Sequence, residues 1–356
     1  MPRTDACAAR KSFEYHVSNY VAMDYDEPGP EEQNASLECS LLAYQAYSYK
    51  IENDYETWFE DSFKLALSDL DNNSSVGNCY MERYGKQVGV ALGWDGFSYE
   101  RERVEILKRM VRDRIGSIER GDLVADPIKV FVKQEPHKIG KIEQGRFRLI
   151  SAVSMVDTMI DRLLFGRFLK NCVENLGKTP CVLGWTPLRG GYRMIVDKFD
   201  VPTMTVDKEG WDWTVRPWLT KLWLRFLKQL ITAPAWWHRL VEARFSLLFE
   251  DPLFRFQDGI MVQQQVPGVM KSGCYLTFFL NSISQTMLHV IAAGRSGVSI
   301  FGTMPLVGGD DTLQPQFPQW EDYVVELRRI GAKPKPPHFN ELGQHAFMGF
   351  VMDAEG

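Results

Sequence analysis

Residues 306–312 read Leu-Val-Gly-Gly-Asp-Asp-Thr, a short apolar run followed by two glycines and two adjacent carboxylates. This pattern predicts a β-hairpin over residues 306–314 whose turn is Gly309-Asp310-Asp311. Glycine at positions 308 and 309 allows the backbone of the turn to approach another molecule closely. The stretch therefore predicts a pair of carboxylates presented on a hairpin turn.

Two further polar patterns precede this hairpin. Asp207 and Asp212 form D-x4-D after the β-prone run 202–206, and residues 272–281 form S-G-x3-T-x3-N. Transfer of a phosphoryl group to a sugar hydroxyl uses two divalent ions about 3.5–4 Å apart, which stabilise the attacking and the leaving oxygens. Magnesium prefers oxygen ligands and typically takes few carboxylates besides substrate phosphates. One carboxylate after a strand and a pair on a facing hairpin turn would therefore suffice to hold it.

The three patterns differ in how often they arise by chance. At average composition, D-x4-D occurs about once in a chain of this length, and Gly-Asp-Asp in roughly one chain in ten or twenty. The pattern over 272–281 occurs in about one chain in a few hundred. Its purely structural interpretation is a helix N-terminus that Ser272 caps, with Thr277 and Asn281 on one face. Finding all three patterns in this order makes coincidence improbable.

The bulk composition is typical of a globular chain with one large or two smaller domains: 356 residues, 45% hydrophobic and 24% charged. No apolar run reaches the roughly 18 residues of a membrane span, and the N-terminus has no apolar signal core. The six cysteines are scattered, so we expect free thiols and no zinc site. The net charge of −5 weakly disfavours nucleic-acid binding, but residues 129–148 carry six basic and two acidic side chains.

Hydrophobic periodicity predicts the local elements around these motifs. Helices are expected over residues 55–70, 98–119, 149–176, 276–293 and 320–330, and over 218–249 with a break at Pro234. Strands are expected over 129–132 and 202–206, with a second hairpin that turns at Asp258-Gly259. Residues 22–36 have the acidic, Pro/Gly-containing composition of a loop.

Together these motifs resemble those of viral RNA-dependent RNA polymerases of the right-hand type, most like the sobemovirus and polerovirus group. Residues 207–212 resemble motif A, 272–281 motif B and 309–311 motif C. Segments 132–138 and 145–150 resemble the basic motif F, 74–80 is similar to motif G, and 347–350 resembles motif E. Lys333 or Lys335 stands where motif D has a lysine. Lys208 and Glu209 depart from the family, because this segment is usually small or apolar.

The resemblance implies an α+β right-hand polymerase with fingers and an antiparallel-sheet palm. The fingers would occupy residues 1–200 and include the basic triphosphate channel. The palm would occupy residues 201–352, with an interleaved fingers segment at about 216–265. Residues 353–356 would form a tail, so that a thumb is absent or incomplete.

The resemblance also implies a role for each motif residue. The implied catalytic and metal-binding residues are Asp207, Asp310 and Asp311. The implied substrate-binding residues are Asp212, Ser272, Gly273, Thr277, Asn281, Lys133, Arg146, Arg148, Lys333 and Lys335. The implied template-binding residues are Ser74, Ser75 and Gly77.

Within these sets, Asp212 and Asn281 would sense the ribose 2′-hydroxyl, which distinguishes RNA from DNA. The three basic residues of motif F would neutralise the triphosphate. Lys333 or Lys335 would be the general acid for the leaving pyrophosphate, or else a plain surface lysine.

The implied cofactor is Mg²⁺, with Mn²⁺ as the alternative ion. The implied partners are an RNA template, nascent RNA and ribonucleoside triphosphates, with other viral replication proteins as further candidates, in a replication complex of the host cytoplasm. Two other hypotheses stay open. A reverse transcriptase is disfavoured by Gly309 and by the pair Asp212 and Asn281. A catalytically silent palm-fold protein that binds RNA or assists assembly is kept open by the missing thumb sequence.

Overall fold

The computed structural model describes residues 3–355 and divides the chain into two compact units. Unit 1 is built from segments 1–22, 51–167 and 233–275, and unit 2 from 23–50, 168–232 and 276–356. Met1, Pro2 and Gly356 lie outside the described residues, so the ends of the expected fingers and tail segments fall there. Helices combined with mostly antiparallel strands are consistent with the expected α+β class.

Unit 1 contains a four-stranded sheet with strand order β3-β2-β6-β7. Its strands are β2 (Ile128–Val132), β3 (Leu149–Ala152), β6 (Leu253–Arg255) and β7 (Met261–Gln263). β2 pairs antiparallel with β3 and parallel with β6, and β6 and β7 form a hairpin. Its helices include α1 (Ala6–Ala22), α3 (Tyr55–Ser68), α4 (Val88–Ala91), α5 (Arg101–Glu119), α6 (Ile139–Glu143) and α10 (Ala235–Phe249). α7 (Met155–Glu174) begins in unit 1 and ends in unit 2.

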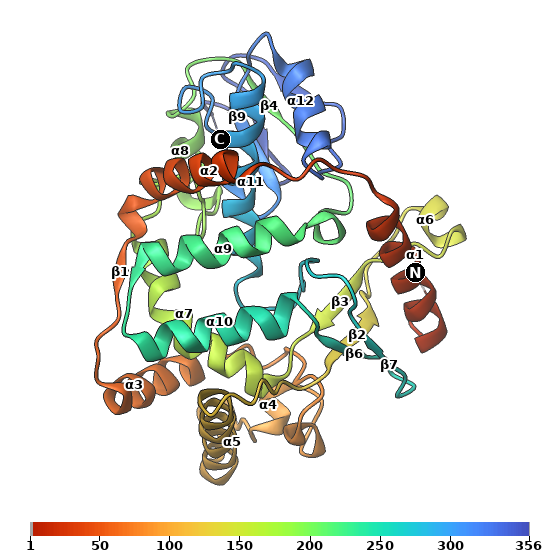
Figure 1. The fold of residues 1–356 in the computed structure, drawn as a ribbon, viewed down its shortest axis with the longest axis vertical. Coiled ribbons are helices and arrows are strands. Elements are labelled where there is room, and N and C mark those ends of the chain that lie inside the picture. Colours follow the sequence, from red (N-terminus) through yellow and green to blue (C-terminus); the bar gives the residue numbers. More distant parts are fainter. Residues whose placement is uncertain (1–2, 356) are drawn as a thin grey trace. The chain divides into compact units, whose positions relative to one another are not determined.

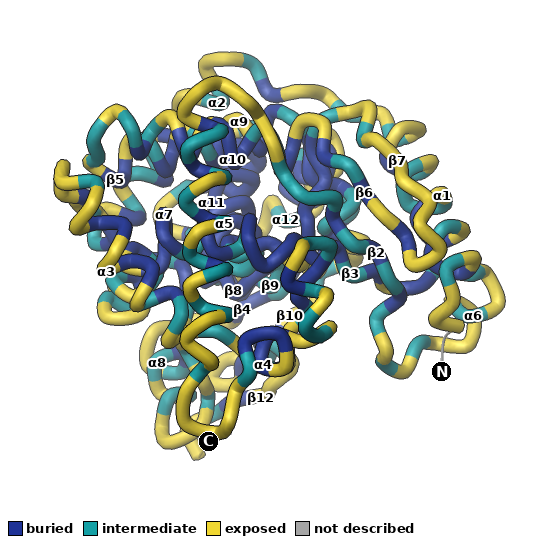
Figure 2. The backbone as a smooth tube through the Cα atoms, turned by 90° about the horizontal axis from the view of Figure 1, so that it is seen from below, coloured by how far each residue is buried: buried dark blue, intermediate teal, exposed yellow. Residues whose placement is uncertain are grey.

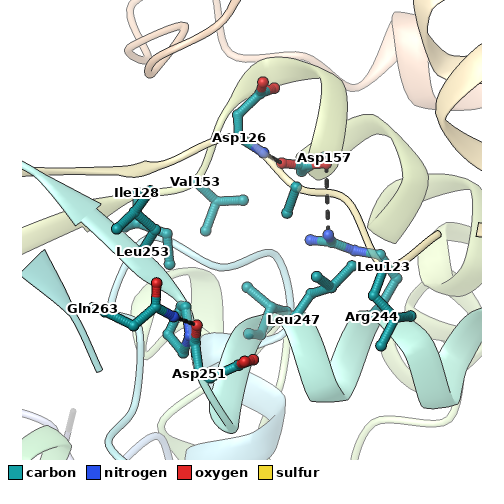
Figure 3. A pocket seen from close by; sticks show the side chains of 13 residues that line it. Leu123, Asp126, Ile128, Val153, Asp157, Arg244, Leu247, Asp251, Leu253 and Gln263 are labelled. Carbon is teal, nitrogen blue, oxygen red and sulfur yellow. Dashed lines mark hydrogen bonds and ion pairs between the residues drawn. The ribbon is translucent and has the colours of Figure 1, made fainter. Parts of the chain in front are cut away.

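A buried network of ionised side chains joins three helices of unit 1. Arg244 on α10 is 1% exposed and donates to both carboxylate oxygens of Asp161 on α7, at 2.7 and 3.1 Å. Asp157, one turn earlier, accepts from Arg114 of α5 at 2.7 Å and lies 3.6 Å from Arg244. Figure 3 shows Arg244 facing Asp157 beside a pocket that apolar and charged side chains line together. Loss of one partner would leave a buried charge uncompensated, so the network ties these helices together.

Unit 2 is organised around a four-stranded sheet with strand order β10-β4-β9-β8. Its strands are β4 (Thr203–Thr205), β8 (Leu306–Gly308), β9 (Asp311–Pro315) and β10 (His338–Asn340). All neighbouring strands in this sheet are antiparallel. Two smaller pairs accompany it: the antiparallel β11 (His345–Phe347) and β12 (Phe350–Met352), and the parallel β1 (Tyr49–Lys50) and β5 (Ile231–Thr232).

Helix α11 (Thr277–Arg295) is the central helix of unit 2 and is buried from Phe279 to Ala293. α2 (Pro30–Ala43), α9 (Pro217–Leu230) and α12 (Trp320–Arg329) pack against it, and Figure 1 shows α2, α9 and α11 side by side. A short helix, α8 (Arg193–Val196), also belongs to this unit. Figure 2 colours the buried stretches dark blue and the exposed loops yellow. A helix that is buried all round provides a rigid support for the strands beside it.

Most of the expected elements form where the patterns predicted them, including both hairpins, the break near Pro234 and the helix that ends before Gly331. Two expectations are wrong. Residues 22–36 are not a continuous loop, because α2 begins at Pro30, where a proline favours the first helical position. Residues 149–152 form β3 rather than the start of a helix, because they pair with β2.

The buried His289 on α11 should make the stability of the fold depend on pH. Its ring is fully buried, with hydrogen bonds to Tyr323 Oη (3.0 Å) and the carbonyl of Ile300 (2.9 Å), and burial lowers the pKa of His289 to about 4. The unfolded chain therefore binds a proton at this imidazole more tightly than the folded chain does. The contribution of neutral His289 to folding stability is present above about pH 6.5 and is lost as the pH falls towards 4. We expect the free energy of unfolding to decrease by about 2 kcal/mol between pH 7.5 and pH 5 from this group.

Urea denaturation at several pH values measures this dependence. The matched variant His289→Gln lacks the titrating ring, so its unfolding free energy should depend less on pH in that range. An equal pH dependence in both proteins would contradict the role of His289.

Candidate active site

The Gly-Asp-Asp stretch forms the turn between β8 and β9 in unit 2. Gly309 has a φ of +64°, a conformation that glycine adopts readily, and its N–H donates to Ser282 Oγ on α11 at 2.9 Å. A Cβ atom at Gly308 would lie 2.3 Å from Met348 Sδ, so a side chain there would require Met348 to move. The turn is thus held against α11, with the carboxylates of Asp310 and Asp311 partly exposed.

The sheet topology brings Asp207 to the same edge as this turn. β4 runs antiparallel to β9 with Met204 opposite Gln314, so the chain leaving β4 passes the residue that opens β9. Thr312 Oγ1 accepts from the N–H of Val206 at 3.3 Å. Asp207 follows directly and is exposed. Carboxylates from two segments far apart in the sequence are therefore neighbours.

The carboxylates repel one another. Burial, followed by the negative charges of Asp310 and Asp207, raises the pKa of Asp311 to about 6. Lys208 is 5% exposed, and burial lowers the pKa of its ammonium to about 8 although the same three carboxylates oppose that change. A cluster of negative oxygens with one buried cation beside it is an electrostatic environment that favours a further cation.

Segment 207–209 runs antiparallel beside residues 333–335. The N–H of Lys335 donates to the carbonyl of Asp207, and the N–H of Glu209 donates to the carbonyl of Lys333, both at 2.8 Å. The ammonium of Lys335 forms an ion pair with the carboxylate of Asp207, which raises the pKa of Lys335. Of the two lysines that stand at the motif D position, Lys335 is the one that pairs with Asp207.

The donor set at this edge suits a hard divalent cation, because its side chains offer carboxylate oxygens that mutual repulsion destabilises. Within residues 3–355, no group of three or more His, Cys, Asp or Glu side chains is arranged as a metal site. The carboxylate of Asp207 is turned towards Lys335. Binding of a metal ion by Asp207 together with Asp310 would therefore replace the ammonium of Lys335 at Asp207.

Asn281 lies one helical turn after Thr277, the first residue of α11, and only 6% of it is exposed. Its Oδ1 accepts from the indole N–H of Trp211 at 2.7 Å. Trp211 begins the 3₁₀ turn Trp211–Thr214, which also contains the partly exposed Asp212. Trp211 thus packs inside the unit and fixes the orientation of the Asn281 amide.

Ser272 is not the N-cap of α11, which corrects the helix-cap interpretation, because the helix begins at Thr277 after Leu276. Ser272 belongs to a loop of unit 1. Its Oγ accepts from the N–H of Ser151 on β3 at 3.2 Å. Gly273 is exposed, and a Cβ atom there would lie 2.4 Å from the carbonyl oxygen of Ser151. This close approach requires glycine at position 273.

Two of the three expected triphosphate residues share one carboxylate of unit 1. Lys133 Nζ and Arg148 Nη1 lie 2.7 and 2.8 Å from the two oxygens of Glu135. Arg146 lies over the ring of Tyr15 at 5.0 Å and donates to Gln144. The side chain of Arg148 is 65% exposed, so it is accessible to an anion despite its ion pair.

The expected template segment is a tight turn of unit 1. Ser74 is exposed, and its hydroxyl donates to Asp71 at 2.9 Å. Ser75 Oγ accepts from the N–H of Gly77 at 3.1 Å. Gly77 has a φ of +67°, and a Cβ atom there would lie 2.7 Å from Ser154 Cα. The segment is thereby packed against the start of α7.

Sequence reasoning missed three residues that shape the unit 2 site: Lys208, Trp211 as the partner of Asn281, and Ser282. The sequence marks Lys208 only as a departure from the usual motif A and does not indicate that its side chain is buried. Ser282 directly follows Asn281, but nothing in the sequence indicates that its hydroxyl meets Gly309.

Comparison with known proteins finds one matching family model and several viral relatives. The family model described as viral RNA-dependent RNA polymerase matches residues 47–349. The chain is 38% identical over 168 residues to the replicase polyprotein P2AB of Southern bean mosaic virus, which covers 45% of the chain and 17% of that protein. It is 25% identical over 356 residues to protein P1-P2 of Potato leafroll virus, which covers 90% of the chain and 32% of that protein.

A third relative is the RNA-directed RNA polymerase of Mushroom bacilliform virus, 30% identical over 214 residues, with 57% of the chain and 50% of that protein covered. The chain thus spans half or less of the length of these three relatives. Across residues 3–355, no helix combines the length and the apolar character needed to span a membrane.

Proposed function

Because the chain belongs to the viral RNA-dependent RNA polymerase family, we propose that it adds ribonucleotides to an RNA 3′ end as directed by an RNA template. The observation that carries the proposal is the meeting of Asp207 with the Asp310-Asp311 turn at one edge of the unit 2 sheet. The fingers would occupy residues 1–200, which include the basic channel, and the palm residues 201–352, with an interleaved fingers segment at about 216–265. The reaction would serve replication of viral RNA in the host cytoplasm, where other viral replication proteins are candidate partners.

In the proposed reaction, Asp207 and Asp310 would hold Mg²⁺ or Mn²⁺, with Asp311 as a neighbouring carboxylate. When bound, two such ions stabilise the attacking 3′-oxygen and the leaving pyrophosphate oxygen. The buried ammonium of Lys208 lowers the repulsion between these carboxylates while they are unliganded. The role of the chain is thus to keep hard oxygen ligands close together at a rigid edge.

Recognition of the nucleotide is assigned to residues around this edge and to the basic segment. Asn281 and Asp212 read the ribose 2′-hydroxyl, beside Thr277. Ser272 and Gly273 lie under the nascent base pair. The triphosphate is bound by Lys133, Arg146 and Arg148, and the template is guided by Ser74, Ser75 and Gly77.

Single-nucleotide incorporation on a primed RNA template tests the function directly. We expect the primer to be extended by a ribonucleotide when Mg²⁺ or Mn²⁺ is present and not to be extended when the ions are chelated. Preferential use of deoxynucleotides would favour a reverse transcriptase. Binding of the primed template without extension by either substrate would favour the catalytically silent RNA-binding protein.

Lys335 is the general-acid candidate, because it pairs with Asp207 whereas Lys333 contributes a backbone contact. We expect Lys335→Met to slow incorporation by at least about 100-fold, the range of general acid catalysis. The same substitution should tighten Mn²⁺ binding by about two- to fivefold, since an exposed ion pair that competes with the metal is removed.

Lys333→Met is the matched control and should alter neither quantity by more than about twofold. Titration calorimetry measures metal binding, and rapid quench measures incorporation. Equal effects of the two substitutions would contradict the assignment to Lys335.

A further inference from the structure

A fully buried lysine lies directly before the Ser272-Gly273 loop in unit 1. Lys271 is 0% exposed, and its Nζ donates to Gln264 Oε1 at 2.7 Å and to the carbonyls of Gly268 and Val269, both at 2.9 Å. Burial lowers the pKa of Lys271, but three oxygen acceptors match the three hydrogens of an ammonium group and favour that form. A buried lysine with a complete set of partners is an anchor that the local structure needs, since burial of the charge is otherwise costly.

The carbonyls that Lys271 binds belong to a strained turn. Val269 has a φ of +58° and Gly268 one of +109°. Positive φ is open to glycine, but it is an outlier for a β-branched residue such as valine. Strain of this kind persists where the surroundings over-determine the backbone, and it concentrates at active sites and ligand clamps. The side chain of Lys271 supplies that constraint, because it binds two consecutive carbonyls of the turn.

Gln264 extends the constraint to the end of α10. Its Nε2 donates to the carbonyls of Phe249 and Gly268, each at 3.2 Å, and the N–H of Gly268 donates to the carbonyl of Phe249 at 2.8 Å. The ring of Phe249 also lies 5.5 Å from Lys271 Nζ, within cation–π distance. Lys271, Gln264 and the last residue of α10 therefore form one connected unit.

The chain after Lys271 is tied to β3. The carbonyl of Lys271 accepts from the N–H of Cys274 at 2.8 Å and closes the turn 271–274. The hydroxyl of Ser272 bridges the β3 backbone, where it accepts from the N–H of Ser151 and contacts the carbonyl of Leu149 at 3.4 Å. Two sets of contacts thus hold the Ser272-Gly273 loop: those of Ser272 with β3 and those of Lys271 with the turn 268–269.

We propose that Lys271 is a positioning residue for RNA synthesis, whose buried ammonium holds the strained turn 268–269 and thereby sets where Ser272 and Gly273 lie. The inference rests on the proposed function, in which this loop lies under the nascent base pair. Lys271 is buried and acts through the loop. Its loss should therefore slow incorporation at saturating nucleotide and leave the concentration dependence on nucleotide nearly unchanged, since the triphosphate is assigned to other residues.

Hydrogen exchange of the full chain without RNA tests the first part of the proposal. In Lys271→Met, the amides of residues 268–274 should exchange at least about tenfold faster than in the wild type, while those of α5 exchange as before. Leu107→Ala, which removes a buried side chain of α5 in the same unit, is the control. It should speed the exchange of the α5 amides and leave that of residues 268–274 as in the wild type. Unchanged exchange over 268–274 in Lys271→Met would overturn the proposal.

Incorporation kinetics test the second part. Lys271→Met should lower the maximal rate of single-nucleotide incorporation about tenfold, with the apparent nucleotide affinity within about twofold of the wild type. The double variant Lys271→Met/Val269→Gly separates positioning from stabilisation, because glycine accepts the positive φ without strain. If Lys271 positions the loop, the double variant should regain the unfolding midpoint of the wild type without regaining its maximal rate of incorporation.

A regained rate in the double variant, or an unaltered rate in Lys271→Met with faster loop exchange, would overturn the positioning role. The proposed function fails in a different way: the wild-type chain would then incorporate no nucleotide with Mg²⁺ or Mn²⁺. Hydrogen exchange still decides in that case whether Lys271 holds the loop.

Discussion

Asp310→Asn should reduce ribonucleotide incorporation by about 1,000-fold or more while the protein stays folded. The amide keeps the shape of the side chain but removes the charge with which the Gly309-Asp310-Asp311 turn would hold a divalent ion. A metal ion that stabilises transition-state charge contributes several kcal/mol, and each 1.4 kcal/mol corresponds to a factor of ten in rate. Single-turnover incorporation on a primed RNA template, with Mg²⁺ at saturation, measures the loss.

The structure also predicts that this variant stays about as stable as the wild type. Loss of the Asp310 charge relieves the repulsion that helps to raise the pKa of Asp311 to about 6, and it also removes an attraction to the buried ammonium of Lys208. The two effects oppose each other, so the thermal midpoint of Asp310→Asn should stay close to the wild-type value, which distinguishes a lost active site from a lost fold. Asp322→Asn, an exposed carboxylate on α12 of the same unit, is the matched control and should leave incorporation intact. Near-normal incorporation by folded Asp310→Asn would refute the active-site assignment.

Substitutions at the ribose-sensing pair should lower the preference for ribonucleotides over deoxynucleotides by about tenfold or more. A site that hydrogen-bonds a substrate hydroxyl rejects substrates without it, because its own polar groups are then left unpaired. Asn281→Asp is the most informative change, since an oxygen remains to accept from Trp211 while the amide donor is lost. Asp212→Ala should act in the same direction. Parallel incorporation kinetics with GTP and dGTP give the ratio.

Two further variants at this site separate recognition of the ribose hydroxyl from the stability of unit 2. Asn281→Ala should also destabilise unit 2, because the buried indole N–H of Trp211 loses its acceptor. Trp211→Phe leaves Asn281 intact but removes the donor that orients it, so its effect on the ratio should be smaller than that of Asn281→Asp. If neither Asn281→Asp nor Asp212→Ala changed the ratio of GTP to dGTP use, the sugar-sensing role would be wrong.

Local patterns were sufficient for most elements of this chain and for the identity of its acidic motifs. The hairpin at 306–314 follows from two glycines before two aspartates, and α12 ends before Gly331, whose φ is +108°. Such features depend on backbone preferences within a few residues, so a linear reading captures them. Errors arose where pairing partners decide the state: residues 149–152 are helix-compatible but become a strand beside β2.

The interactions that give the site its chemistry are long-range. Lys335 meets Asp207, Trp211 orients Asn281, and Ser282 holds Gly309, each across 27 or more positions in the sequence. They follow from the strand order β10-β4-β9-β8 and from the placement of α11, which no periodicity encodes. Burial of Lys208 among carboxylates and of Lys271 under a strained turn likewise depends on packing, because a lysine's charge favours water unless a folded environment supplies its partners. The sequence motifs thus indicate the type of chemistry, and the tertiary contacts determine which side chains lie together at the candidate site.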